Sequence, residues 1–169
     1  NTKKPKSEPN FSKFKIQNEN NKPFHQNIVR PSKQLKIAHQ NINGLRNKIE
    51  RLSHFLYSTD TDLIILTEHG LNKENVQSCR IPGYASLGGF TREQHRKGGV
   101  IAYVKQELED QFSLVRTSGQ TSELICEISY YKLTTNKGCL LILGVYRPPS
   151  SNLDDTTDIL TAELDKALT

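Results

Sequence analysis

The first apolar pattern along the chain predicts a strand followed by a helix. Residues 35–42 alternate between two faces, and one face carries Leu35, Ile37 and, near its end, Asn41. The apolar residues that come next recur every three or four positions, which is the period of an amphipathic helix. They are Leu45, Ile49, Leu52, Phe55 and Leu56. We therefore expect a strand and then a helix that buries one face.

The next apolar run is short and uninterrupted. Residues 63–67 read Leu-Ile-Ile-Leu-Thr and lie between Asp62 and Glu68. A run without polar alternation is typical of a strand that is covered on both faces. The pattern therefore places the carboxylate of Glu68 at the end of a buried strand.

The remainder of the chain predicts more strands and a last helix. Residues 69–98 have no regular period and contain Pro-Gly and Gly-Gly pairs, so we expect a long irregular connection there. A final amphipathic helix is expected to begin near residues 151–155, where early aspartates suit a helix N-terminus. Further strands are predicted over 100–104, 124–130 and 140–146. Strands and helices in this arrangement predict a layered α/β domain.

The positive charge lies mainly at the start of the chain. Residues 1–34 hold eight Lys or Arg against two Asp or Glu, whereas residues 35–169 hold 15 basic and 16 acidic residues. The first segment is rich in Asn, Lys, Pro and Ser, and its apolar residues have no period. We predict a disordered basic tail or linker over 1–34 and one domain over 35–169. Counterion release on a nucleic acid and simple solvation both explain such a tail.

Composition excludes an integral membrane protein. The mean hydropathy is −0.61, and no run approaches the roughly 20 apolar residues of a membrane helix. No secretory signal is recognisable, and three cysteines without CxxC spacing are expected to be reduced, packed thiols. We expect a nuclear or cytoplasmic protein that is not secreted and has no membrane partner.

Four short motifs carry a family resemblance. They are Gln-Asn-Ile-Asn-Gly-Leu at 40–45, Asp-Leu-Ile-Ile-Leu-Thr-Glu at 62–68, Gly-Gly-Val at 98–100 and Val-Tyr-Arg-Pro-Pro at 145–149. In this order and spacing they resemble the N-terminal half of the endonuclease/exonuclease/phosphatase superfamily, and especially the endonucleases of non-LTR (LINE-type) retrotransposons. The resemblance covers nearly all of residues 35–169. It implies the N-terminal half of a DNase I-like four-layer α/β sandwich, with two packed mixed β-sheets flanked by helices.

Glu68 is the candidate metal ligand. Carboxylate oxygens suit a hard ion such as Mg²⁺ or Mn²⁺, and Mg²⁺ needs few protein ligands because it retains several waters. A bound ion would polarise a phosphate oxygen and stabilise the leaving oxygen. Taken alone, a strand-end glutamate is more often part of a surface ion pair, and the surrounding motifs favour the metal role.

The resemblance also gives roles to three neighbours of this motif set. Asn41 is implied as a catalytic residue that helps hold the scissile phosphate and the attacking water. Asn43 is implied as a metal-site residue acting through a water. Tyr146 is implied as a catalytic residue that directs its hydroxyl at the phosphate. The structural alternatives are a turn asparagine for Asn41 and a packed strand-end tyrosine for Tyr146.

A basic cluster precedes the strand at 100–104. Arg92, Arg96 and Lys97 lie in a glycine-bounded segment, and we expect them to contact a DNA backbone. An exposed, solvated loop has the same composition, so that interpretation stays open. We assign no role to His54 or His69, because neither has the partners of a histidine-based metal site.

Part of the implied catalytic machinery does not occur in these 169 residues. The resemblance leads us to expect a Gly-Asp-Phe-Asn strand and a later Ser-Asp-His segment, but neither is present and no histidine follows His95. A general base must lie within hydrogen-bond reach of the attacking water. We therefore expect this chain alone to be inactive or nearly so.

Three functional hypotheses follow from the sequence. The first is a fragment of a metal-dependent DNA endonuclease that nicks target DNA to prime reverse transcription, with a reverse transcriptase domain on the same full-length product. The second is another phosphoesterase of the same fold. The third is a decayed or domesticated module that binds nucleic acid. The Tyr-Arg-Pro-Pro motif favours the first over the second.

Overall fold

Two packed β-sheets form the centre of the molecule. The computed structural model describes residues 34–168, so the predicted tail lies outside the described residues except for Gln34. The first sheet has the strand order β1 (Ile37–Asn41), β2 (Leu63–Thr67), β4 (Val100–Lys105) and β3 (Tyr84–Phe90). The second has the order β5 (Phe112–Thr117), β6 (Glu127–Thr135) and β7 (Gly138–Tyr146). The helices are α1 (Ile49–Thr59), α2 (Lys73–Val76) and α3 (Leu153–Leu168).

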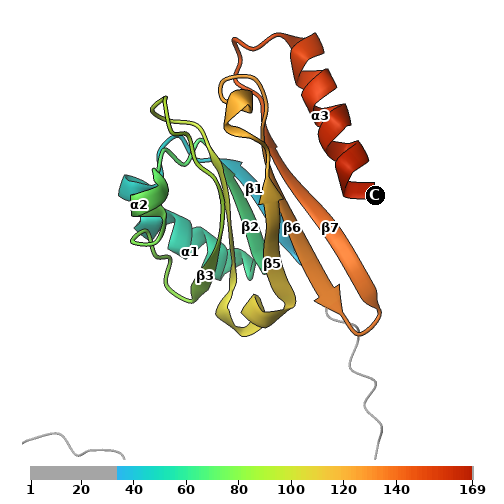
Figure 1. Cartoon of the computed structure of the whole chain (residues 1–169). Helices are drawn as coiled ribbons and strands as arrows, with labels where there is room; N and C mark the ends of the chain where they lie inside the picture. Colours follow the sequence, from blue (N-terminus) through green and yellow to red (C-terminus); the bar gives the residue numbers. More distant parts are fainter. Residues whose placement is uncertain (1–33, 169) are drawn as a thin grey trace, which may run out of the picture. The chain divides into compact units, whose positions relative to one another are not determined.

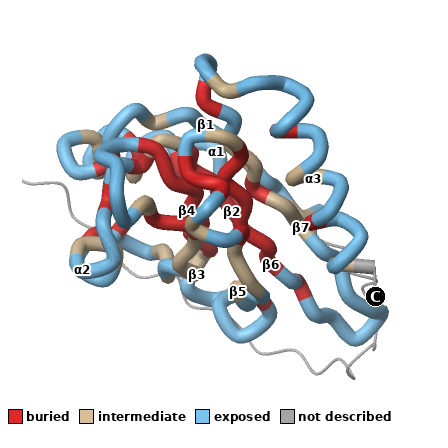
Figure 2. Tube along the Cα trace, turned by 45° about the horizontal axis from the view of Figure 1, so that its top comes forward, coloured by how far each residue is buried: buried red, intermediate tan, exposed pale blue. Residues whose placement is uncertain are grey.

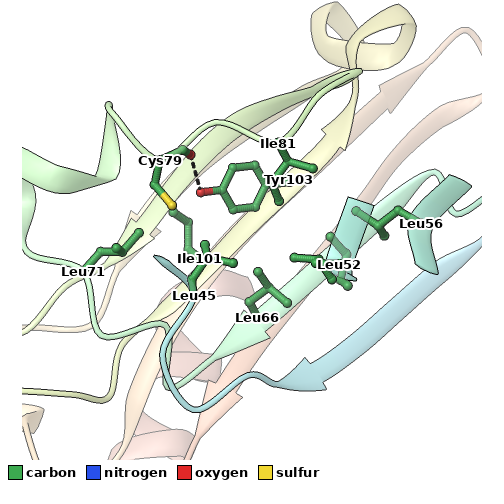
Figure 3. Close-up of a cluster of buried hydrophobic side chains, with 10 residues drawn as sticks. Leu45, Leu52, Leu56, Leu66, Leu71, Cys79, Ile81, Ile101 and Tyr103 are labelled. Carbon is green, nitrogen blue, oxygen red and sulfur yellow. Dashed lines mark hydrogen bonds between the residues drawn. The ribbon is translucent and has the colours of Figure 1, made fainter. Parts of the chain in front are cut away.

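The helices cover the outer faces of the sheets, so the described residues form four layers (Figure 1). One apolar cluster joins α1 to the first sheet, and Figure 3 shows Leu52 and Leu56 of α1 facing Leu66 of β2. A second cluster fills the space between the sheets and includes Ile65 and Tyr131. A third joins β6 and β7 to α3. This arrangement confirms the predicted fold.

Strand β2 lies at the centre of these layers. All five of its residues are buried, which confirms the prediction from the uninterrupted apolar run (Figure 2). It pairs with β1 in parallel, so that Asn41 lies opposite Thr67, and with β4 in antiparallel fashion, so that Thr67 lies opposite Val100. The register brings the end of β1, the end of β2 and the start of β4 to one edge of the sheet.

The predicted irregular connection over 69–98 is wrong in part, because it contains α2 and strand β3. Glycines interrupt the apolar pattern of β3, and a bulge shifts its register between Ser86 and Gly88. Gly89 is required by packing, since a Cβ there would lie 2.0 Å from the carbonyl oxygen of Val100. A strand with these features has no period-two signal in the sequence.

Other boundaries also differ from the prediction. Strand β5 was not predicted, although Phe112 and Leu114 alternate along it. Strand β6 begins at Glu127 and not at 124, because Leu124 adopts a left-handed backbone conformation with φ of 66°. The first sheet is mixed as expected, whereas the described strands of the second sheet are all antiparallel.

The structure also bears on the expectations for membrane helices and for the cysteines. No helix within residues 34–168 is long and apolar enough to cross a membrane. Cys79, Cys126 and Cys139 are all free thiols. Cys79 and Cys126 are buried as expected, but the expectation of a packed thiol is wrong for Cys139, which is exposed on β7.

Candidate active site

Glu68 follows β2 directly, and its backbone is fixed from both sides. Its N–H donates to the carbonyl of Gly99 at 3.0 Å, and its carbonyl accepts from the N–H of Gly44 at 2.7 Å. Its φ of 54° lies in the left-handed region that side-chain-bearing residues rarely adopt. Such strained positions persist where the surrounding structure enforces them, and they are common at functional sites.

The structure brings the three predicted catalytic residues together. The Asn41 side-chain amide donates to Oε1 of Glu68 at 2.8 Å, and the Tyr146 hydroxyl donates to the same oxygen at 2.7 Å. Asn41 comes from the end of β1 and Tyr146 from the end of β7, so both sheets contribute to the cluster. Among the described residues, none donates a hydrogen bond to the other carboxylate oxygen, Oε2.

Glu68 is held as a carboxylate at neutral pH. The hydrogen bond from Asn41, and then the one from Tyr146, lower the pKa of Glu68, while its partial burial opposes them. The positive charges of Arg92 and Lys97 lower this pKa further. Burial and the bond to the carboxylate raise the pKa of Tyr146 to about 12, so its hydroxyl stays protonated and acts as a donor.

The donor set around Glu68 fits a hard divalent cation. Within residues 34–168, no cluster of three or more His, Cys, Asp or Glu side chains could hold a metal ion. A site built like a zinc centre, with three or four protein ligands, is therefore not present in that range. Mg²⁺ is commonly held by one or two carboxylates and several waters. Glu68, ionised and with Oε2 available, meets that requirement.

Asn43 contacts this cluster through its backbone N–H, and its side chain takes no part in the contact. Its N–H donates to Oδ1 of Asn41 at 3.2 Å, which orients the Asn41 amide toward Glu68. The Asn43 side chain is exposed and makes no hydrogen bond with another described residue. Its role through a metal-bound water stays a prediction.

The structure separates the three predicted DNA-contacting residues. Arg96 and Lys97 are exposed. The Arg92 side chain is only 8% exposed and pairs with Glu127, with Nε 2.5 Å from Oε1. Its guanidinium carbon lies 6.0 Å from the centre of the Tyr146 ring. DNA contact stays a prediction for all three, and the exposed side chains of Arg96 and Lys97 fit it better than that of Arg92.

Two buried carboxylates anchor this basic segment, and the sequence analysis did not identify them. Glu127 binds Arg92 as described. Glu123 accepts hydrogen bonds from the N–H groups of Glu93 and Gln94 and from His95, whose Nδ1 is 2.7 Å from Oε2. Burial raises the pKa of Glu123, but these hydrogen bonds outweigh it and hold the pKa below its usual value. The sequence did contain a sign of Glu127, because a charged residue inside the apolar run at 124–130 indicates a buried carboxylate with a partner.

His69 is buried, and both of its ring nitrogens are hydrogen-bonded to the backbone. Its Nε2 lies 3.0 Å from the carbonyl of Phe90, and its Nδ1 accepts the N–H of Leu71 at 3.0 Å. Burial lowers the pKa of His69 to about 4. A neutral ring with both nitrogens engaged inside the protein has no nitrogen left for a metal. His54, by contrast, is exposed on α1.

No family model matches the chain, and no curated protein matches its sequence. The structure of D. rerio TDP2 with a single-stranded DNA product matches with a TM-score of 0.54 and 14% identity, over 79% of this chain and 54% of that chain.

Two bacterial proteins match in the same way. The mannosyl-6-phosphatase Bt3783 of Bacteroides thetaiotaomicron has a TM-score of 0.50 and 11% identity, over 80% of this chain and 60% of that chain. An endonuclease/exonuclease/phosphatase family protein of the same species has a TM-score of 0.50 and 13% identity, over 79% of this chain and 58% of that chain. This chain thus spans between half and two thirds of each protein. The described residues have the DNase I-like fold of the endonuclease/exonuclease/phosphatase proteins.

Proposed function

We propose that this chain is part of a divalent-metal-dependent DNA endonuclease that hydrolyses phosphodiester bonds. The observation that carries the proposal is the convergence of Asn41 and Tyr146 on one oxygen of Glu68, at the ends of β1, β7 and β2. The arrangement fixes a carboxylate, keeps it ionised and leaves its second oxygen available. These are the properties that a ligand for Mg²⁺ or Mn²⁺ needs.

Each residue of the cluster has a separate task in this proposal. Glu68 holds the cation, which when bound stabilises negative charge on the phosphate and the leaving oxygen. Asn41 and Tyr146 hold the Glu68 carboxylate in one orientation through their hydrogen bonds. Asn41 keeps a second side-chain N–H, which is a neutral donor beside the position where negative charge develops, and such preorganised donors stabilise a transition state.

DNA is the substrate that the surroundings of this site favour. The exposed Arg96 and Lys97 lie in the segment that leads to Gly99, whose carbonyl binds Glu68. Cationic side chains near a scissile phosphate position a DNA backbone. TDP2, which has the same fold, was solved with a single-stranded DNA product.

The finer assignment is to a non-LTR retrotransposon. The Asn-Ile-Asn-Gly and Tyr-Arg-Pro-Pro motifs support it, since they resemble those of the LINE-type endonucleases. In that setting the full product carries a reverse transcriptase domain, acts in the nucleus or cytoplasm, and nicks target DNA to prime reverse transcription. A different phosphoesterase activity is the second candidate, because the mannosyl-6-phosphatase Bt3783 has this fold as well.

Plasmid nicking with Mg²⁺ tests the proposal. The proteins to compare are this chain, a longer product of the same reading frame, and the longer product with Glu68→Ala. We expect nicking by the longer product and a loss of about a thousandfold or more with Glu68→Ala, since metal-assisted charge stabilisation contributes several kcal/mol.

The matched control is Glu50→Gln, an exposed carboxylate on α1, which should retain full activity. A sugar phosphate offered to the same proteins separates the two candidates, because hydrolysis of that substrate without plasmid nicking would favour a phosphatase. A well-folded longer product that cleaves neither substrate would contradict both.

A further inference from the structure

A second carboxylate, Glu127, lies at the same end of the sheets as Glu68. It is the first residue of β6 and is fully buried, with Ile128 and Tyr130 following it in the strand. A buried charge is costly unless it is paired and hydrogen-bonded. Both oxygens of the Glu127 carboxylate are hydrogen-bonded. Oε1 accepts from Nε of Arg92 at 2.5 Å, and Oε2 accepts from the N–H of Gly99 at 2.6 Å.

The contact with Gly99 leads to the backbone of Glu68. The carbonyl of Gly99 accepts the N–H of Glu68 at 3.0 Å, so one residue connects the two glutamates. The position allows only glycine, because a Cβ on Gly99 would lie 2.2 Å from Nε2 of His69 and its φ is 88°. Glu127 therefore binds the N–H of a glycine that no other residue type can replace, and the carbonyl of the same glycine binds the N–H of Glu68.

The contact with Arg92 leads to the side chain of Glu68. The guanidinium packs against Gly98, where a Cβ would lie 2.2 Å from its atoms, and lies 6.0 Å from the Tyr146 ring centre. A cation beside an aromatic ring is attracted to its face, and the attraction is strongest where water is excluded. Tyr146 in turn donates its hydroxyl to Oε1 of Glu68.

The two connections end on the same residue from different directions. Glu127 reaches Glu68 through the backbone N–H and carbonyl of Gly99 on one side and through Arg92 and Tyr146 on the other. An apolar pair of similar volume is often as stable as a buried ion pair. Stability alone therefore does not require a carboxylate here, whereas a fixed anion with two acceptor oxygens is needed to hold both segments.

We propose that Glu127 is a positioning residue, which fixes Glu68 through Gly99 and Tyr146 through Arg92. It does not contact the substrate or the metal ion. This assignment rests on the proposed role of Glu68, and it also gives Arg92 a task inside the site in place of a contact with the outer DNA backbone.

The experiment is an NMR comparison of this chain with its Glu127→Gln variant, without metal. Two signals report on Glu68 at a distance from position 127: the Asn41 side-chain amide, which donates to Oε1, and the Glu68 backbone amide. We expect the Asn41 side-chain signals to shift and the Glu68 amide hydrogen to exchange at least about tenfold faster in Glu127→Gln.

Glu123→Gln is the matched control, because Glu123 is also buried and also anchors the basic segment but does not contact Gly99 or Arg92. It should leave both signals unchanged. If Glu127→Gln does not fold, the paired variant Arg92→Leu with Glu127→Leu removes both charges and should give the same two changes. Unchanged Asn41 and Glu68 signals in a folded variant would overturn the proposal. A separate titration of the unmodified chain with Mn²⁺ tests the proposed function, and failure to bind there would count against that function and not against the role of Glu127.

Discussion

The two ends of strand β2 carry carboxylates in opposite environments. Asp62, just before the strand, is buried and bonded to Nζ of Lys105 at 2.8 Å and to the N–H of Lys36 at 2.9 Å. Glu68, just after the strand, is partly exposed and accepts from two neutral donors. A cation of the protein thus neutralises Asp62, while no described side chain forms a direct ion pair with Glu68. The difference indicates a structural carboxylate at one end and a carboxylate available to an external cation at the other.

Lys105 forms ion pairs with both carboxylates at the Asp62 end. Burial lowers the pKa of Lys105, but its bonds to Asp60 and Asp62 outweigh burial and raise the pKa above its usual value. The pKa of Asp60 is lowered by the same contact, first through the hydrogen bond from Lys105. Nζ of Lys36 also lies 3.4 Å from Oδ2 of Asp60, so two lysines balance the two carboxylates at this end.

The largest expected effect is a difference in stability between the two ends. Asp62→Ala should lower the free energy of unfolding by about 3–5 kcal/mol, because it removes the buried carboxylate that accepts from both Lys105 and the N–H of Lys36 and leaves Lys105 with the exposed Asp60 alone. Glu68→Ala should lower it by only about 1 kcal/mol, since it removes two hydrogen bonds at a partly exposed site. Urea unfolding of both variants measures the difference, and equal losses would remove the distinction between the two ends.

A smaller effect on stability is expected from pH, through His69 beside Glu68. The pKa of His69 is lowered from 6.5 to about 4 in the folded protein, so the unfolded chain binds a proton first as the pH falls. Stability should therefore be complete above pH 6.5 and should decrease below it, by about 2 kcal/mol between pH 6.5 and pH 5. This window lies above the range in which Glu68 titrates.

Urea midpoints measured across that window test the assignment to His69. The His69→Gln variant should be less stable than the unmodified chain at neutral pH. Its urea midpoint should change little with pH, because glutamine does not titrate. The control His54→Gln, on the exposed side of α1, should retain the slope. A slope that survives His69→Gln would show that another group causes it.

The smallest expected effect concerns DNA affinity at the Glu68 end. Arg96→Gln and Lys97→Gln should each weaken DNA binding a few-fold and reduce the salt dependence by about one counterion, because each removes one phosphate contact. Fluorescence anisotropy at several salt concentrations measures both quantities. Lys137→Gln, in the turn between β6 and β7 at the other end of the second sheet, is the control. An equal effect of Lys137→Gln would indicate charge attraction without a defined site.

The sequence was informative where a pattern is local. The uninterrupted apolar run predicts the buried strand β2, and the motif order places Asn41, Glu68 and Tyr146 in one site. Strand β3 could not be predicted, because Gly89 is required by the close approach of β4 and Gly88 has a φ of 77° at the bulge, and neither gives a local period. The tasks of Glu127 and Arg92 depend on a contact between residues 35 positions apart, which no spacing in the sequence reveals.

Manganese binding by this chain tests the central claim most directly. Mn²⁺ broadens NMR signals near its site, so a titration of the unmodified chain and of Glu68→Gln locates the ion. The account predicts that the Asn41 side-chain amide and the amides around Glu68 broaden first, that Glu68→Gln abolishes this, and that signals near Asp62 stay sharp. Equal broadening in Glu68→Gln, or a first effect near Asp62, would contradict the assignment of Glu68 as the metal ligand.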